Sequence, residues 1–164
     1  MINKINKLSQ SEFTKVFANI FENASWIAEE LYKQKPFGDF GELSSKMMDI
    51  FEMSSKEKKL KILNDHPDLA NKAKISSLTP DSLKEQKNSG LDQCTEDEFN
   101  EFKKLNEDYK KFGFPFILAI KNKSKIEILN NFRKRINSEK QVEFDEAIKQ
   151  VKKIASLRLE NLNN

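Results

Sequence analysis

The chain has 164 residues and a formal net charge of +3, and 37% of its residues are hydrophobic and 34% charged. This length is typical of one domain, and the 13 Phe exclude a disordered chain, because disordered chains are poor in aromatic residues. Four Gly and four Pro are too few for the many turns of a β-sandwich or barrel. The composition therefore predicts an all-α fold in a single domain over residues 1–164.

Charge and the rare residue types also limit the partners of the chain. Cations and anions are interleaved, so a net charge of +3 gives little support for nucleic-acid binding. Cys94 and His66 are the single Cys and the single His, which excludes an intrachain disulfide and a His/Cys zinc site but leaves a carboxylate-only magnesium site open. No apolar run is long enough to span a membrane and the first residues lack a signal-peptide core, so we expect a soluble, cytoplasmic protein without membrane partners.

Helix start signals recur along the chain and predict about seven or eight helices. A Ser or Thr followed three residues later by Glu or Gln matches the capping box, in which both side chains satisfy free amides of the first turn. The matches are Ser9 with Glu12, Ser54 with Glu57, Thr95 with Glu98, Ser124 with Glu127, and Ser138 with Gln141. Thr79 before Pro80 is a further helix start with Pro in the first turn.

Between these starts, apolar residues recur at the steps of three and four residues that are typical of helices. The apolar stripes cover residues 13–31, 99–112, 128–136 and, less regularly, 142–157. Gly90 and Gly113 lie where a left-handed residue would end a helix. The predicted connections are the segments around 34–42, 66–80 and 88–95.

The apolar run from Phe114 to Ile120 departs from the helical pattern. Pro115 has no amide hydrogen and biases Phe114 towards an extended backbone. A lone strand has no pairing partner in this chain, so we predict extended chain that crosses the interior. Its backbone groups need hydrogen-bond partners, and a planar polar ligand can supply them.

His66 opens the run His66-Pro67-Asp68-Leu69-Ala70, behind the helix predicted from Ser54. Pro67 ends that helix and sets the direction of His66. Histidine readily gives and takes a proton near neutral pH, which makes His66 a candidate general acid or base. The alternative is a histidine whose charge suits a helix C-terminus, and at helix ends this alternative is the commoner one.

On the helix that starts at Thr79, Ser82, Glu85 and Gln86 share one face and can hold a ligand that makes several hydrogen bonds. By periodicity alone, a solvated helix surface is the better-supported alternative. Arg158 lies between two leucines and can point inward to bind a carboxylate, or it can be an exposed salt-bridge partner.

Three blocks in order resemble the family of 2-oxo-4-hydroxy-4-carboxy-5-ureidoimidazoline (OHCU) decarboxylases. The blocks are His66-Pro67-Asp68-Leu69-Ala70, Ser82-x-x-Glu85-Gln86-x-x-Ser89-Gly90-Leu91, and Leu105-Asn106-x-x-Tyr109-x-x-Phe112-Gly113-Phe114-Pro115-Phe116-Ile117. The segment from Phe21 to Ala28 resembles the opening of the family, and the pair Arg158-Leu159 resembles its closing segment. The resemblance covers nearly the whole chain.

The resemblance implies an all-helical, cofactor-free and homodimeric enzyme that converts OHCU to (S)-allantoin and CO₂, the third step of urate degradation. It implies that His66 is the catalytic general acid and base and that Glu85 orients it. The substrate-binding residues that it implies are Pro67, Ser82, Leu83, Lys84, Glu85, Gln86, Ile117, Leu118, Ala119, Ile120, Lys121 and Arg158.

Two other interpretations stay open. The first is a non-enzymatic helical interaction module that binds an acidic partner through its lysines. The second is a relative that keeps the scaffold and acts on another ureido or imidazole compound.

Overall fold

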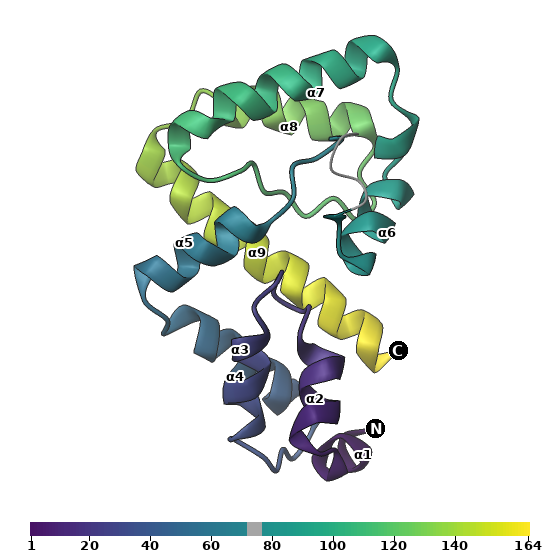
Figure 1. Cartoon of the computed structure of the whole chain (residues 1–164), viewed down its shortest axis with the longest axis vertical. Coiled ribbons are helices and arrows are strands. Elements are labelled where there is room, and N and C mark those ends of the chain that lie inside the picture. The colour runs from purple at the N-terminus through teal and green to yellow at the C-terminus, as the bar shows by residue number, and fades with distance from the viewer. Residues whose placement is uncertain (72–76) are drawn as a thin grey trace. The chain divides into compact units, whose positions relative to one another are not determined.

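The computed structural model describes residues 1–71 and 77–164 (Figure 1), and every regular element in these ranges is helical. The described residues form nine α-helices and short 3-10 turns, which confirms the all-α prediction. The α-helices are α1 (Ile2–Lys7), α2 (Gln10–Phe17), α3 (Ser25–Tyr32), α4 (Phe40–Glu52), α5 (Lys56–Asp65), α6 (Pro80–Asn88), α7 (Glu96–Tyr109), α8 (Lys125–Arg135) and α9 (Lys140–Asn163). Part of the predicted connection 66–80, residues 72–76, lies outside the described residues.

The chain divides into two compact units. The first unit holds Met1–Ile62 and Lys152–Asn164, and the second holds Leu63–Val151. Helices α5 and α9 each contribute residues to both units. The single domain expected from the length stays a prediction.

Aromatic rings form the core of the first unit. The rings of Phe13 and Phe17 lie 4.6 Å apart on α2, and Phe21 stacks on Phe51 of α4 at 4.8 Å. Val16, which the sequence placed in the same apolar stripe, is 44% exposed, so that assignment is wrong. Phe13 and Phe17, four residues apart, define the buried face of α2, and Val16 on the same helix lies off this face.

Three of the five predicted capping boxes are present, at Ser9, Thr95 and Ser124. The start predicted at Ser54 is one residue early, because Ser55 Oγ accepts the Lys58 N–H at 3.2 Å while Ser54 donates back to the Phe51 carbonyl. Likewise α9 starts at Lys140, and the Ser138 N–H bonds the Arg135 carbonyl of the preceding helix. Each early prediction fails because the last turn of the preceding helix still uses the proposed cap residue.

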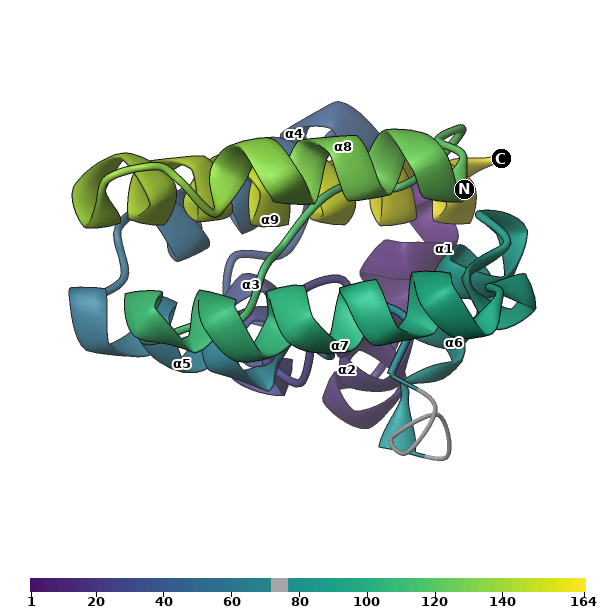
Figure 2. The same ribbon diagram turned by 90° about the horizontal axis from the view of Figure 1, so that it is seen from above.

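A second aromatic cluster forms the core of the second unit around Tyr109, whose ring lies 4.6 Å from Phe112, 5.6 Å from Phe116 and 5.7 Å from Phe132. Gly113 ends the helical stretch with a φ of 84°, and the chain from Pro115 to Ile120 has no regular secondary structure, as predicted. Figure 2 shows this segment passing from the end of α7 to the start of α8.

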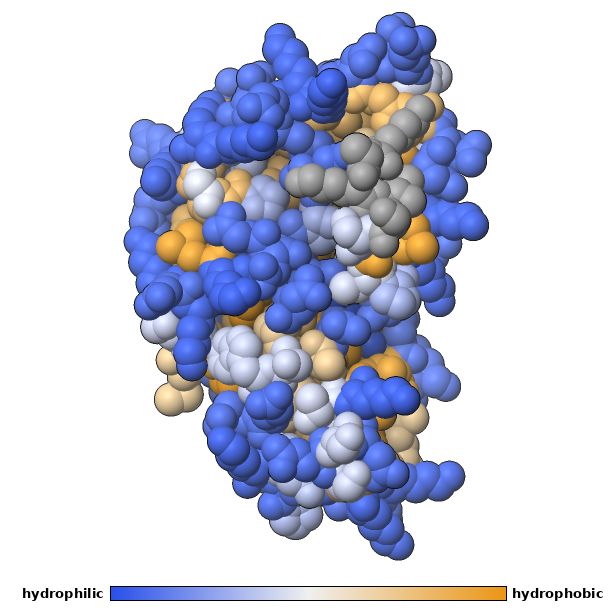
Figure 3. All heavy atoms as spheres, viewed as in Figure 1, coloured by the Kyte–Doolittle hydropathy of each residue, from blue (hydrophilic) through white to orange (hydrophobic). Residues whose placement is uncertain are grey.

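No helix in the described ranges is both long and apolar enough to cross a membrane. Figure 3 shows that hydrophilic side chains cover most of the face drawn there, with smaller apolar patches between them. This surface agrees with a chain in which a third of the residues are charged.

Candidate active site

His66 follows the last residue of α5, where the sequence predicted that Pro67 would stop the helix. Its backbone N–H still bonds the Leu63 carbonyl at 3.2 Å, which continues the last turn of the helix. Both His66 and Pro67 are half-buried. The imidazole is therefore attached to a helix end and is partly accessible, which suits a group that must exchange protons.

Two side-chain amides hold the loop that follows His66. Gln86 Oε1 accepts the Ala70 N–H at 3.1 Å, and Gln86 Nε2 donates to the Asp68 carbonyl at 3.2 Å. Asn106 of α7 donates to the carbonyl of Leu69 at 3.0 Å. Ala70 has a φ of 54°, a left-handed conformation that a non-glycine residue rarely adopts. Three consecutive residues are thus held by side chains of α6 and α7, which keeps a strained loop in one conformation.

Helix α6 turns its polar face inward. It starts at Thr79, which caps it as predicted, and Ser82 and Gln86 are 4% and 7% exposed. Glu85 on the same face is half-buried. Leu83 and Lys84 lie on the exposed side of the helix. Ser82 and Gln86 are therefore part of the interior and Glu85 lies at its edge, so the alternative of a solvated surface is wrong for Ser82 and Gln86.

The chain from Ile117 to Ile120 is buried, and side chains from three places in the second unit hold its backbone. Arg135 Nη1 donates to the Ile117 carbonyl at 2.5 Å, and Gln150 Oε1 accepts the Ala119 N–H at 2.9 Å. Ser89, the C-cap of α6, donates to the Ile120 carbonyl at 2.9 Å. Lys121 is exposed. Side chains of the protein thus supply several of the partners that an extended interior segment needs.

A buried charged cluster, which was not predicted from the sequence, contacts this segment through Arg135. Glu143 accepts hydrogen bonds from the Tyr109 hydroxyl and from Arg135 Nε, the latter at 2.7 Å, and Arg135 also lies over the Phe116 ring at 4.5 Å. Burial, and then the hydrogen bond to Glu143, raise the pKa of Tyr109 and keep it protonated.

A sequence signal for this cluster existed. Arg135 continues the buried stripe of Ile128 and Phe132 at helical spacing, and Glu143 precedes the buried Ala147 on α9 by four residues. Charged residues on the apolar face of a helix indicate a buried ion pair.

Arg158 lies in the first unit and is buried. Its Nη1 donates to the Glu22 carboxylate at 2.9 Å and to the Asn19 carbonyl at 2.8 Å. The inward orientation is as the sequence suggested, and the partners seen are protein groups. Contact of Arg158 with a substrate stays a prediction.

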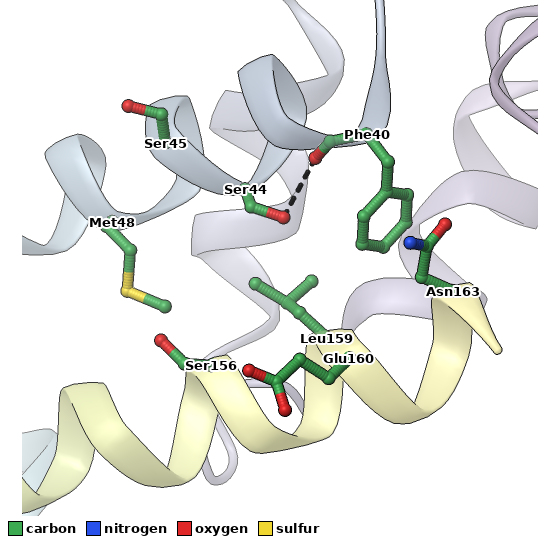
Figure 4. A pocket seen from close by; sticks show the side chains of 8 residues that line it. All are labelled: Phe40, Ser44, Ser45, Met48, Ser156, Leu159, Glu160 and Asn163. Carbon is green, nitrogen blue, oxygen red and sulfur yellow. Dashed lines mark hydrogen bonds between the residues drawn. The ribbon is translucent and has the colours of Figure 1, made fainter.

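The first unit also has a pocket between α4 and α9, with a volume of about 290 Å³ (Figure 4). Ser44, Met48, Ser156 and Glu160 line it, and the Ser44 hydroxyl is bonded to the Phe40 carbonyl. None of the residues predicted to bind substrate lines this pocket. Among the described residues, no group of three or more His, Cys, Asp or Glu side chains is arranged to hold a metal ion.

Hydrogen bonds thus join the three predicted segments of the second unit. Gln86 connects α6 to the loop behind His66, and Ser89 connects α6 to Ile120. The site offers a histidine, a nearby helix with a hydroxyl and a carboxylate, and a buried segment of backbone. Such a set can move a proton and hold a planar polar molecule. Direct contact of Glu85 with the imidazole stays a prediction.

Comparisons with known proteins identify the family of this chain. The family model described as OHCU decarboxylase matches residues 6–160. A uric acid degradation bifunctional protein of Bacillus sp. (strain TB-90) is 39% identical over 162 residues, which cover 98% of this chain but only 32% of the length of that relative.

Two further relatives agree with the family match. The 2-oxo-4-hydroxy-4-carboxy-5-ureidoimidazoline decarboxylase of Haloferax volcanii is 34% identical over 159 residues, covering 96% of this chain and 93% of that protein. The crystal structure of an (S)-allantoin synthase is similar with a TM-score of 0.77 and 29% identity, over 98% of this chain and 53% of that one. The chain, with its three motif blocks joined in one unit, belongs to the OHCU decarboxylase family.

Proposed function

We propose that the chain is a carboxy-lyase that converts OHCU to (S)-allantoin and CO₂, the third step of urate degradation. The names of its relatives support this substrate and product. The observation that carries the proposal is the pair of hydrogen-bonded links from α6, one to the loop behind His66 and one to Ile120. They join the loop that follows the proposed proton-transferring residue to the proposed binding backbone in one unit.

The substrate explains why this chemistry needs no prosthetic group. When the carboxylate leaves as CO₂, the two electrons of the broken C–C bond need an acceptor. In OHCU the neighbouring ring carbon is double-bonded to nitrogen, so these electrons form a new C=C bond and the C=N electrons move to nitrogen. The remaining steps are proton transfers: the hydroxyl loses a proton to become a carbonyl, the neighbouring carbon gains one, and the ring nitrogen that received the C=N electrons takes up another from solvent.

His66 is the group that we propose for these proton transfers. It takes or relays the hydroxyl proton as CO₂ departs and helps to deliver a proton to one face of the intermediate, which gives a single enantiomer. Glu85 orients the imidazole and stabilises its charged form, as an acidic neighbour does for other catalytic histidines. Buried apolar residues around Phe116 exclude water, which favours loss of the carboxylate charge.

The proposed substrate contacts come from the same two segments and the loop. Ser82 and Gln86 face inward, and the buried backbone from Ile117 to Ile120 offers donors and acceptors to the planar ring. The loop residue Pro67 packs beside them in this proposal. The exposed residues Leu83, Lys84 and Lys121, together with Arg158, complete the proposed set.

The decisive experiment replaces the proposed catalytic histidine. We expect His66→Asn to lower the turnover of OHCU by about 10²- to 10⁴-fold, because a positioned acid or base contributes about this much to the rate. OHCU is generated in situ from urate by urate oxidase and hydroxyisourate hydrolase, and circular dichroism follows the enantiomer formed. Far-ultraviolet circular dichroism checks that the variant keeps its helices.

Two results would count against the proposal. Parental turnover by His66→Asn would remove the histidine from the mechanism. Racemic allantoin from the unmodified protein, at the spontaneous rate of OHCU decay, would favour the alternative of a relative that acts on another ureido compound.

We further propose a cytoplasmic homodimer, as the resemblance implies. Sedimentation equilibrium of the purified protein measures its mass in solution. A mass of 19.1 kDa, that of one chain, would contradict the dimer.

A further inference from the structure

The two peptide bonds on either side of Leu118 are each held by one side chain. Arg135 of α8 donates to the carbonyl of Ile117, and Gln150 of α9 accepts the N–H of Ala119. The first group belongs to the peptide plane between Ile117 and Leu118. The second belongs to the plane between Leu118 and Ala119.

Peptide planarity then fixes the direction of the groups of Leu118. In a trans peptide the C=O and the N–H point to opposite sides, and the single cis bond of the described residues lies at Lys35–Pro36. The Leu118 N–H therefore points away from the Ile117 carbonyl and its partner Arg135. The Leu118 C=O likewise points away from the Ala119 N–H and its partner Gln150.

This donor and acceptor are available for a ligand. Leu118 is 6% exposed, and within the described ranges neither its N–H nor its C=O has a hydrogen-bond partner. Buried backbone groups are nearly always paired, so an adjacent donor and acceptor without partners indicate a place for a molecule with a complementary edge. The edge of a cyclic urea carries an N–H beside a C=O, which matches this pair.

We propose that Arg135 and Gln150 are positioning residues, which turn the N–H and C=O of Leu118 towards the amide edge of the substrate. The inference rests on the proposed function, because it takes its substrate from there. Neither side chain needs to touch the substrate itself.

Both positioning residues are themselves held in place. Glu143 holds the guanidinium of Arg135 through Nε, with Nη2 2.5 Å from the same carboxylate oxygen, and Tyr109 donates to that oxygen as well. Gln150 donates to Glu146 at 2.8 Å, one turn earlier on α9, and so keeps its oxygen towards Ala119. Because the guanidinium of Arg135 is planar and held by Glu143 on one side, its Nη1 on the other side fixes the direction of the Ile117 carbonyl.

The experiment compares variants that each remove one of the two side-chain hydrogen bonds to the backbone beside Leu118. Gln150→Met removes the acceptor for the Ala119 N–H but keeps a side chain of similar length. Arg135→Lys keeps the positive charge beside Glu143 but lacks the fork that reaches the Ile117 carbonyl. We expect each variant to raise KM for OHCU about three- to tenfold, the worth of about one hydrogen bond, while kcat stays within about twofold.

Two matched controls separate positioning from folding. The swap Glu146→Gln with Gln150→Glu keeps an acceptor at residue 150, a donor at residue 146 and the net charge, so KM should stay within about twofold of the parent. Arg133→Lys alters an arginine on the same helix whose Glu101 partner is at the surface, and KM should not change. Binding of (S)-allantoin by titration calorimetry, with thermal unfolding of each variant, gives a measure besides turnover.

The outcomes are distinct. If the parent converts OHCU and Gln150→Met keeps the parental KM and (S)-allantoin affinity, the inference is overturned. The same holds if the swapped variant loses affinity as fully as Gln150→Met, since it keeps the acceptor. If the parent does not convert OHCU, the proposed function is contradicted, and with it the substrate that this inference assumes.

Discussion

Both ends of the Gln86 side-chain amide form hydrogen bonds with the backbone of the loop that follows His66. Its oxygen holds the Ala70 N–H and its nitrogen holds the Asp68 carbonyl, and the residue is buried. Ala70, whose N–H takes part in one of these bonds, has a left-handed conformation that costs about 1–3 kcal/mol. Gln86 therefore holds the loop after His66 in its conformation, in addition to any contact with substrate.

Replacing Gln86 should disturb catalysis as well as binding. If Gln86 only contacted the substrate, Gln86→Ala would mainly weaken substrate binding. Because Gln86 also holds the loop backbone, we expect Gln86→Leu to lower kcat together with substrate affinity. It should also reduce the free energy of unfolding by about 1–3 kcal/mol, because the Ala70 N–H and the Asp68 C=O lose their partners. Steady-state kinetics and urea unfolding measure both, with the exposed Lys87→Ala on α6 as the control. A raised KM with unchanged kcat and stability would assign Gln86 to the substrate alone.

Arg158 and Glu22 form a buried ion pair that can be tested by itself. We expect Arg158→Met to lower the free energy of unfolding by about 3–5 kcal/mol, because it deprives a buried carboxylate of its arginine. Glu22→Gln in the same chain should recover most of this loss in urea unfolding. If the stable double variant also keeps the parental KM, Arg158 does not bind the substrate.

Tyr109 of α7 and Glu143 of α9 connect two helices of the second unit through a buried hydrogen bond. Glu143 also accepts a hydrogen bond from Arg135, which in turn donates to the carbonyl of Ile117. Helix packing, the buried charge and the proposed binding segment are therefore coupled.

The raised pKa of Tyr109 predicts how this link responds to alkali. Burial and the Glu143 carboxylate disfavour the phenolate in the folded state. Above about pH 10 the unfolded chain releases this proton and the folded chain keeps it, so stability falls as pH rises, by up to about 1.4 kcal/mol per pH unit. Urea unfolding of the parent and of Tyr109→Phe between about pH 9 and 11 measures the difference.

Tyr32→Phe is the control for this series, because Tyr32 is the other tyrosine of the chain and is half-buried. Parallel pH profiles for the parent and Tyr109→Phe would contradict the predicted contribution of Tyr109.

The whole molecule consists of two compact units that share helices. Helix α9 continues without interruption through the residue at which the units divide, and α5 does the same. A helix that belongs to two units transmits unfolding from one to the other, because its hydrogen bonds form cooperatively.

We therefore predict one cooperative unfolding transition, as expected for the single domain inferred from the length. Differential scanning calorimetry should show one peak with a calorimetric enthalpy equal to the van't Hoff enthalpy. Two resolved transitions would show that Met1–Ile62 with Lys152–Asn164 and Leu63–Val151 melt as separate domains.

The sequence by itself determined the helical class, the starts of α2, α6, α7 and α8, the end of α5 before Pro67, the left-handed Gly90 and Gly113, and the resemblance that marked His66. These are local features, set by caps, by apolar spacing and by residues with restricted backbones. Only the tertiary structure decided that Gln86 clamps Asp68 and Ala70, that Arg135 holds Ile117 and that Gln150 holds Ala119. These partners are 16 to 31 residues apart, and the folded backbone alone brings them within hydrogen-bond distance.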